Sequence, residues 1–205
     1  MCYFPFELTF LEALQGIHNS ILNPLMVFIT SLGNAGLIWI LATVVLLFPK
    51  KTRPCGIAMG ISLLLGLIFG NGILKNVIAR TRPCWNTDGS YTLGGVPISA
   101  LLQDSVVSLL GKLPTDYSWP SGHTLSSVEC ALVVFYHNRK PWGIVAIVLA
   151  VLIAFSRLYI GVHWPTDILG GALLGFATAS AAIAITKLIF KKIAARKQAN
   201  DVLEY

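Results

Sequence analysis

Three long runs without a charged residue constrain this chain more than any other feature of its sequence. They are Leu25–Phe48, Gly56–Leu74 and Ile168–Thr186, and each can cross the hydrocarbon core of a bilayer, which is about 30 Å thick. Because no water reaches the backbone inside that core, a crossing segment must satisfy its own hydrogen bonds as a helix. With 55% hydrophobic and 12% charged residues, the 205-residue chain is expected to form one all-α, membrane-embedded domain over residues 1–205.

Two further apolar segments extend the expected transmembrane helical bundle to about five or six spans. Trp142–Phe155 is short, but it becomes a span if Arg157 lies at the far interface, and Gly122–Tyr136 is interrupted by Glu129. The first residues lack a basic region and a small-residue cleavage site, so no cleavable signal peptide is expected. The chain is therefore predicted to be a polytopic membrane protein.

The N-terminal segment 1–24 is expected to carry a helix that lies in the membrane interface. Phe10, Leu11, Leu14 and Ile17 recur at helical spacing and form one apolar stripe, while the acidic residues of this segment fall elsewhere. At the other end of the chain, residues 191–205 are predicted to form a cytoplasmic tail.

The longest connection, residues 84–119, is predicted to be an extracytoplasmic loop that contains an amphipathic helix. Apolar residues recur at helical spacing from Ile98 to Leu113, with Pro97 near the start of the pattern. A helix that rests on the membrane surface is the simpler interpretation. A lid over an active site, or a gate for lipid entry, is the alternative, since loops of this length tend to be functional.

The net charge of +6 does not indicate a nucleic-acid-binding protein, because the basic residues flank the apolar runs. In a five-span topology, ten of the fifteen lysines and arginines lie on one side of the membrane, which predicts that this side is cytoplasmic. They are Lys50, Lys51, Arg53, Arg139, Lys140, Lys187, Lys191, Lys192, Arg196 and Lys197.

The four cysteines form no Cys-x-x-Cys pair and no Cys/His cluster, so no metal site is expected. A disulfide between Cys2 and Cys84 would require both residues to face outward, and it stays an open alternative. The sequence assigns no oligomeric state.

Three short blocks near the ends of apolar segments combine the residues needed to attack a phosphate ester. They supply three cations, two histidines and one carboxylate, together with a glycine beside an expected helix start. Such a reaction requires positive charge and N–H donors around the phosphoryl oxygens, a nucleophile, and an acid for the leaving oxygen. The blocks are Lys75 with Arg82-Pro83, Pro120-Ser121-Gly122-His123, and Ser156-Arg157 with His163 and Asp167.

These blocks resemble the type 2 phosphatidate phosphatase family, which shares its site with the vanadium haloperoxidases. All eleven fixed positions of the family pattern occur in this chain, in order and at the family's spacing. The resemblance implies that His163 attacks phosphorus and forms a phosphohistidine, that Asp167 orients its imidazole, and that His123 acts as acid and then as base. It also implies a substrate-binding role for Lys75, Arg82, Ser121, Gly122 and Arg157, a secondary or structural role for Ser156, and no metal or cofactor.

By the same resemblance, the leading hypothesis is a membrane phosphatase that removes the terminal phosphate from a lipid phosphate or diphosphate, with undecaprenyl diphosphate as the leading substrate. The distribution of lysine and arginine predicts that its active site faces outward. Phosphatidylglycerol phosphate and phosphatidate are alternative substrates. A second hypothesis is that the bundle binds or transports a lipid phosphate without cleaving it, and a third is haloperoxidase-like chemistry on bound vanadate. Outside the motif, Arg80 is expected to contact lipid headgroups, and Glu129 is expected to have a polar packing role or to tune the site.

Overall fold

The computed structural model describes residues 4–85, 92–93, 96–97, 109–112 and 114–203, and these are mainly helical. The two-residue strands β1 (Thr92–Leu93) and β2 (Val96–Pro97) pair in an antiparallel manner. The helical elements are α1 (Pro5–Gln15), α2 (Leu22–Leu32), η1 (Asn34–Gly36), α3 (Leu37–Leu47), α4 (Arg53–Leu65), η2 (Gly66–Leu74), α5 (Lys75–Ile78), α7 (Gly122–His137), η3 (Arg139–Gly143), α8 (Ile144–Tyr159) and α9 (Pro165–Leu203).

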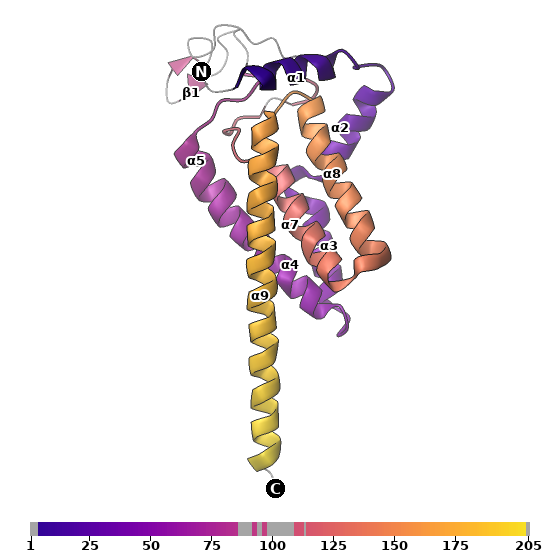
Figure 1. Ribbon diagram of the computed structural model, residues 1–205, viewed down its shortest axis with the longest axis vertical. Helices are drawn as coiled ribbons and strands as arrows, with labels where there is room; N and C mark the ends of the chain where they lie inside the picture. Colours follow the sequence, from indigo (N-terminus) through magenta and orange to yellow (C-terminus); the bar gives the residue numbers. More distant parts are fainter. Residues whose placement is uncertain (1–3, 86–91, 94–95, 98–108, 113, 204–205) are drawn as a thin grey trace.

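The described helices confirm the prediction of an all-α membrane bundle. Arg53–Ile78, Lys140–Tyr159 and Pro165–Asp201 are each long and apolar enough to cross a membrane, and α2 with α3 forms a fourth candidate that is bent by 41°. The remaining expected span is α7, whose 16 residues extend about 24 Å. It lies inside the bundle, packed between α8 and α9 (Figure 1).

The uncharged run Leu25–Phe48 is two helices, not the single continuous span that the sequence predicts. The break falls at η1, where Ala35 (φ 51°) and Gly36 (φ 68°) adopt left-handed backbone conformations. Gly33 permits a close approach here, because a Cβ atom at this position would lie 2.8 Å from the imidazole of His123. The break therefore presents the side chain of Asn34 to His123.

The second uncharged run predicts a helix that continues past Lys75 to Thr81 and places Lys75 and Arg82 on nearly one face. This prediction was wrong. The backbone widens into a π-helix along η2, and the helix ends at Ile78 because Ala79 adopts a left-handed conformation (φ 48°). Lys75 and Arg82 consequently do not share one helix face. The chain instead turns at Ala79 and brings Arg82 back toward the end of the bundle that carries Lys75.

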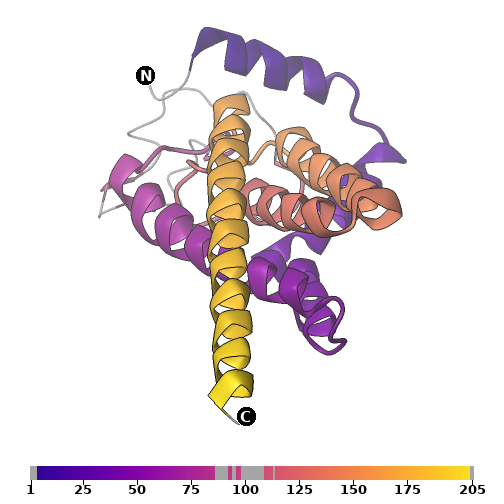
Figure 2. The same cartoon turned by 60° about the horizontal axis from the view of Figure 1, so that its bottom comes forward.

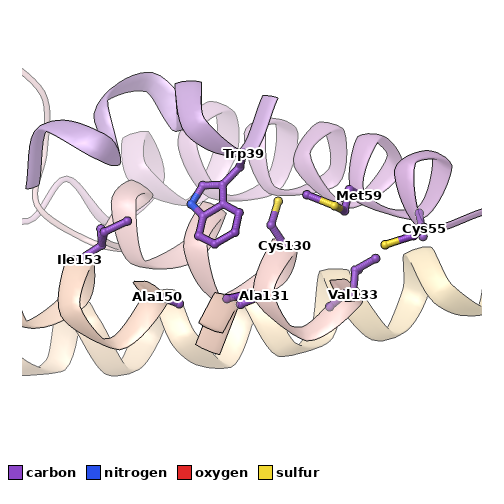
Figure 3. Close-up of a cluster of buried hydrophobic side chains, with 11 residues drawn as sticks. Trp39, Cys55, Met59, Cys130, Ala131, Val133, Ala150 and Ile153 are labelled. Carbon is purple, nitrogen blue, oxygen red and sulfur yellow. The ribbon is translucent and has the colours of Figure 1, made fainter. Parts of the chain in front are cut away.

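The core lies around α7, which packs against α4, α8 and α9. Its central cluster includes Trp39, Met59, Cys130 and Ile153, which are all buried (Figure 3). The indole Nε1 of Trp39 donates a hydrogen bond to Ser127 Oγ at 3.0 Å, so the largest side chain of the cluster keeps its polar atom satisfied.

Close packing of α7 against α9 depends on Gly171. A Cβ atom at this position would lie 2.7 Å from the backbone oxygen of Ser121 and 3.1 Å from Thr124. We expect Gly171→Ala to destabilise the fold by about 1–3 kcal/mol, because the two helices must separate to admit the methyl group. Thermal unfolding in detergent measures this loss. Gly60→Ala is the matched control, since the nearest atom to its new Cβ is 3.7 Å away, and a control variant as unstable as Gly171→Ala would contradict the argument.

Helix α1 lies across one end of the bundle, whereas α9 extends far beyond the other end (Figures 1 and 2). Helix α1 lies within segment 1–24, where Leu11 is buried against Leu158 and Trp164, whereas Phe4, Phe6 and Phe10 are exposed. Most of the amphipathic helix expected from Ile98 to Leu113 falls at residues 98–108, outside the described residues, and residues 109–112 are not helical. Residues 191–203 of the expected tail continue α9.

Candidate active site

The three sequence blocks meet at the end of the bundle that α1 covers. Helix α7 begins there, α8 ends there, and α9 starts there with Pro165. Gly161, whose φ is +76°, turns the chain just after α8 and so directs His163 back toward the bundle. The backbone N–H of Ser121 donates to the carbonyl of Asp167 at 3.1 Å, which joins the starts of α7 and α9.

A cavity of about 1000 Å³ opens beside these helix ends. Among the residues expected at the site, Ser121, Ser156 and Asp167 lie behind its wall and are fully buried. The other six line the cavity: Lys75, Arg82, Gly122, His123, Arg157 and His163.

The imidazole of His163 is held between a carboxylate and a guanidinium. Its Nδ1 lies 3.3 Å from Asp167 Oδ2, and its Nε2 lies 3.1 Å from Arg82 Nη1. Because a guanidinium can only donate, Nε2 must accept, and the ring proton therefore belongs on Nδ1. Burial, together with the neighbouring charges of Arg82 and Arg157, lowers the pKa of His163 well below its usual range. The imidazole is thus neutral, and a lone pair on Nε2 faces the cations.

The two cations of the first block bind a carboxylate that the sequence analysis did not select. Asp116 Oδ2 accepts from Lys75 Nζ at 2.5 Å, and its Oδ1 accepts from Arg82 Nη2 at 2.7 Å. Burial raises the pKa of Asp116, but the charges of Arg82 and Lys75 outweigh it and lower the pKa to about 2. Asp116 is therefore anionic at ordinary pH, and half of its side chain is exposed.

Arg157 is buried at the end of α8 and retains capacity to bind an anion. Its Nη1 donates to Thr30 Oγ1 at 2.8 Å, and its Nε has no hydrogen-bond partner among the residues that the structure describes. An unpaired donor of a buried guanidinium that lines a cavity is suited to an incoming phosphoryl oxygen.

The two serines of the motif have local backbone roles in this structure. Ser121 caps α7, where its hydroxyl accepts from the backbone N–H and the hydroxyl of Thr124 at 3.4 and 3.0 Å. The hydroxyl of Ser156 donates to the carbonyl of Ile153 at 2.6 Å, within its own helix. Gly122 permits close approach, because a Cβ atom there would lie 2.9 Å from Asn71 Oδ1.

His123 lies on the first turn of α7, and its Nε2 is 3.1 Å from Asn34 Oδ1. Asn34 belongs to the break between α2 and α3, so it is brought to the site by the feature that interrupts the first span. No motif in the sequence marks Asn34 or Asp116. The only signal for Asp116 is its position as a carboxylate four residues before the Pro-Ser-Gly-His block.

The expectation that Arg80 contacts lipid headgroups was wrong. Only 10% of its side chain is exposed, and its guanidinium is paired with Glu7 and Asp167, each at 2.6 Å. Glu129 also lies outside the motif. It lines the cavity, is buried in α7, and accepts hydrogen bonds from Ser62 at 3.3 Å and from Thr178 at 2.6 Å.

The fold and the site define a polytopic membrane protein in which an aspartate–histidine pair faces a cluster of cations. Comparison with protein families matches residues 56–191 to the PAP2 superfamily, and the chain belongs to this family. The resemblance to type 2 phosphatidate phosphatases is confirmed, and the expected class of membrane phosphatase is confirmed at the level of the family.

Individual relatives agree with this assignment. An undecaprenyl-diphosphatase of Sulfolobus acidocaldarius is 38% identical over 154 residues, which cover 75% of this chain and 66% of that protein. Phosphatidylglycerophosphatase B of Bacillus subtilis is 30% identical over 172 residues, covering 75% of this chain and 70% of the relative. The crystal structure of a transmembrane PAP2-type phosphatidylglycerolphosphate phosphatase from Bacillus subtilis superposes with a TM-score of 0.64 at 27% identity, covering 91% of this chain and 85% of that one.

Proposed function

We propose that this protein is a lipid phosphatase that removes the terminal phosphate from undecaprenyl diphosphate through a phosphohistidine intermediate. One observation carries the proposal: the neutral imidazole of His163 is held by Asp167 and presents Nε2 to Arg82, on the wall of a cavity. A nucleophile placed among cations is suited to an anionic electrophile that repels nucleophiles in water.

In the first step, His163 Nε2 attacks the terminal phosphorus and the bond from phosphorus to the bridging oxygen breaks. Lys75, Arg82 and Arg157 neutralise the phosphoryl oxygens, and the N-terminus of α7 adds backbone donors beside Gly122. His123 gives its proton to the departing oxygen, which leaves as the lipid monophosphate. Asp167 accepts a hydrogen bond from Nδ1–H and stabilises the positive charge that develops on the ring.

In the second step, water attacks the phosphorus of the phosphohistidine and the P–N bond breaks. His123, now neutral, takes a proton from this water, and inorganic phosphate leaves. His123 starts protonated and His163 starts neutral, and the two steps together restore both states, so the cycle balances. The three cations supply the charge neutralisation, and we therefore expect turnover in the presence of EDTA.

The shape of the cavity supports a lipid substrate. From the cations it continues to apolar side chains on α3, α4 and η2, and three of these are also exposed on the outside of the bundle. An acyl or prenyl tail can therefore lie along the bundle while its phosphate enters between the cations. The apolar residues are Ile40, Leu63, Leu64 and Leu67, of which Leu63 is partly buried.

We further propose that the site faces the extracytoplasmic side. Helix α1 and the three blocks mark one end of the molecule. The opposite side carries the basic segments, which are the α3–α4 connection, the α7–α8 connection and the second half of α9 (Figure 1). An excess of lysine and arginine is typical of cytoplasmic segments, so the end that carries the site is proposed to lie outside.

The test is release of inorganic phosphate by the purified protein in detergent with EDTA present. Undecaprenyl diphosphate, phosphatidylglycerol phosphate and phosphatidate are compared at equal surface concentration, since the relatives include both an undecaprenyl-diphosphatase and a phosphatidylglycerophosphatase. Highest kcat/KM on undecaprenyl diphosphate is expected. No release from any of them, or equal release by His163→Ala, would reject the enzymatic proposal and favour lipid-phosphate binding or transport.

Asp116 provides a separate prediction, because its carboxylate holds the positions around Lys75 and Arg82 that phosphoryl oxygens would take. Asp116→Asn removes this competing charge while the Asp116 carbonyl still accepts from Arg82 Nε. We expect the inhibition constant of inorganic phosphate to fall roughly 3- to 10-fold, corresponding to about 1 kcal/mol. Product-inhibition kinetics measure it, with Asp201→Asn on the distant part of α9 as control. Weaker inhibition by phosphate would contradict the competition.

A further inference from the structure

Arg80 has an unusual position for a residue outside the motif. It follows the end of α5, and its Nη1 donates to Asp167 Oδ1 and to Thr166 Oγ1, both at 2.6 Å. Its Nη2 donates to Glu7 Oε2, also at 2.6 Å. One buried guanidinium therefore joins the start of α9 to helix α1.

The two oxygens of Asp167 have separate partners. Oδ1 accepts from Arg80, whereas Oδ2 accepts from Ser118 Oγ and from the backbone N–H of Trp164 at 2.8 Å, and it faces His163 Nδ1 at 3.3 Å. Because both oxygens are occupied, the carboxylate cannot rotate without breaking an ion pair. The bond to Arg80 thus determines how Asp167 aims at the imidazole.

Glu7 in turn fixes Arg80. Its side chain is completely buried, and its second oxygen, Oε1, accepts from the backbone N–H of Thr166 at 3.1 Å and from the hydroxyl of Thr166 at 2.6 Å. The guanidinium of Arg80 also lies over the indole of Trp164, 5.6 Å from the ring centroid. Trp164 in turn packs against Leu11 of α1. The ion pair of Arg80 with Glu7 and its contact with Trp164 therefore both depend on the docking of α1.

We propose that Arg80, held by Glu7, is a positioning residue for the Asp167–His163 pair. The inference rests on the proposed function, because it assigns a purpose to the orientation of the nucleophile. Arg80 does not touch the substrate in this scheme, and it acts through Asp167 alone. A loss of Arg80 should therefore slow the attack on phosphorus and leave phosphate binding by Lys75, Arg82 and Arg157 intact.

The test uses a double variant, because Arg80→Gln alone leaves two buried carboxylates, Glu7 and Asp167, without their shared cation and so destabilises the fold. Glu7→Gln/Arg80→Gln removes one of these two unmatched charges and keeps Asp167, so the protein should melt at a higher temperature than Arg80→Gln. We expect its kcat to stay roughly 10- to 100-fold below that of the parent, as for a misplaced catalytic group. KM and the inhibition constant of phosphate should change by less than about 3-fold, which a general loosening of the site would not allow.

A second readout does not depend on turnover. The proton on His163 Nδ1 should give a downfield ¹H NMR resonance that is lost in His163→Gln, and we expect the double variant to shift this resonance upfield. Arg53→Gln, at the opposite end of the molecule, should leave both readouts unchanged. A folded double variant with the kcat and the resonance of the parent would overturn the inference. A parent that shows the resonance but releases no phosphate would reject the proposed function and retain the positioning role.

Discussion

His163→Gln is expected to lower kcat by about four orders of magnitude or more, the largest effect of any substitution in this chain. Glutamine keeps a polar side chain of similar reach, but it has no lone pair that can form a bond to phosphorus. Loss of a nucleophile in comparable triads leaves only the contribution of binding and electrostatics. Release of inorganic phosphate, followed with excess enzyme to extend the range, measures the loss.

A matched control is available in the same chain. His137 lies at the far end of α7, where its Nδ1 is 3.0 Å from the carbonyl of Val133. We expect His137→Gln to keep the activity of the parent. Acid-labile, base-stable ³²P should be trapped on the parent during turnover and be absent from His163→Gln. Trapping on the variant, or equal activity of the two proteins, would show that another residue attacks phosphorus.

His123→Ala is expected to lower kcat on the lipid substrate by about 10²- to 10⁴-fold, the range typical of a general acid. The size of the loss should depend on the leaving group, which separates an acid from a residue that merely packs. An aryl phosphate with an acidic phenol leaves without a proton, so the first step on this substrate should be nearly as fast in the variant as in the parent.

The measurement is therefore a comparison of the pre-steady-state burst of phenol with the rate of turnover. His123→Ala should retain the burst and lose the subsequent hydrolysis, because the same imidazole activates water in the second step. Ser126→Ala is a suitable control one turn along α7, where the hydroxyl donates to the carbonyl of His123 at 3.3 Å. A variant that loses the burst and turnover equally would contradict the role of His123 as acid.

The sequence predicted the membrane class and the residues that gather at the cavity, because both depend on strong patterns. Uncharged runs of helical length identify spans. The motif residues that line the cavity come from three blocks that are far apart in the sequence but could be recognised by their fixed spacing. The path of the backbone between them was predicted less well. The sequence contained no indication that η2 would widen or that Ala79 would end the helix, since a left-handed alanine is stabilised by its surroundings and not by its own preference.

The residues that sequence reasoning missed share a physical cause. Asn34 and Asp116 reach the site, and Glu7 reaches Arg80, from segments that have no motif, and their roles arise from tertiary contacts. Arg80 was misassigned because a cation at a membrane edge usually extends to the headgroups. Two buried carboxylates compete for it more strongly than lipid does, and nothing in the local sequence indicates where Glu7 will lie.

The length of α9 has a practical consequence. Its 39 residues extend about 58 Å, almost twice the thickness of a hydrocarbon core, so its final turns emerge well clear of the lipid as a stiff stalk. An affinity tag fused to this stalk can tether the molecule to a sensor chip while the opposite end of the molecule, where α7 and α9 begin, stays unobstructed. Captured in this way, one preparation could be presented with successive lipid vesicles.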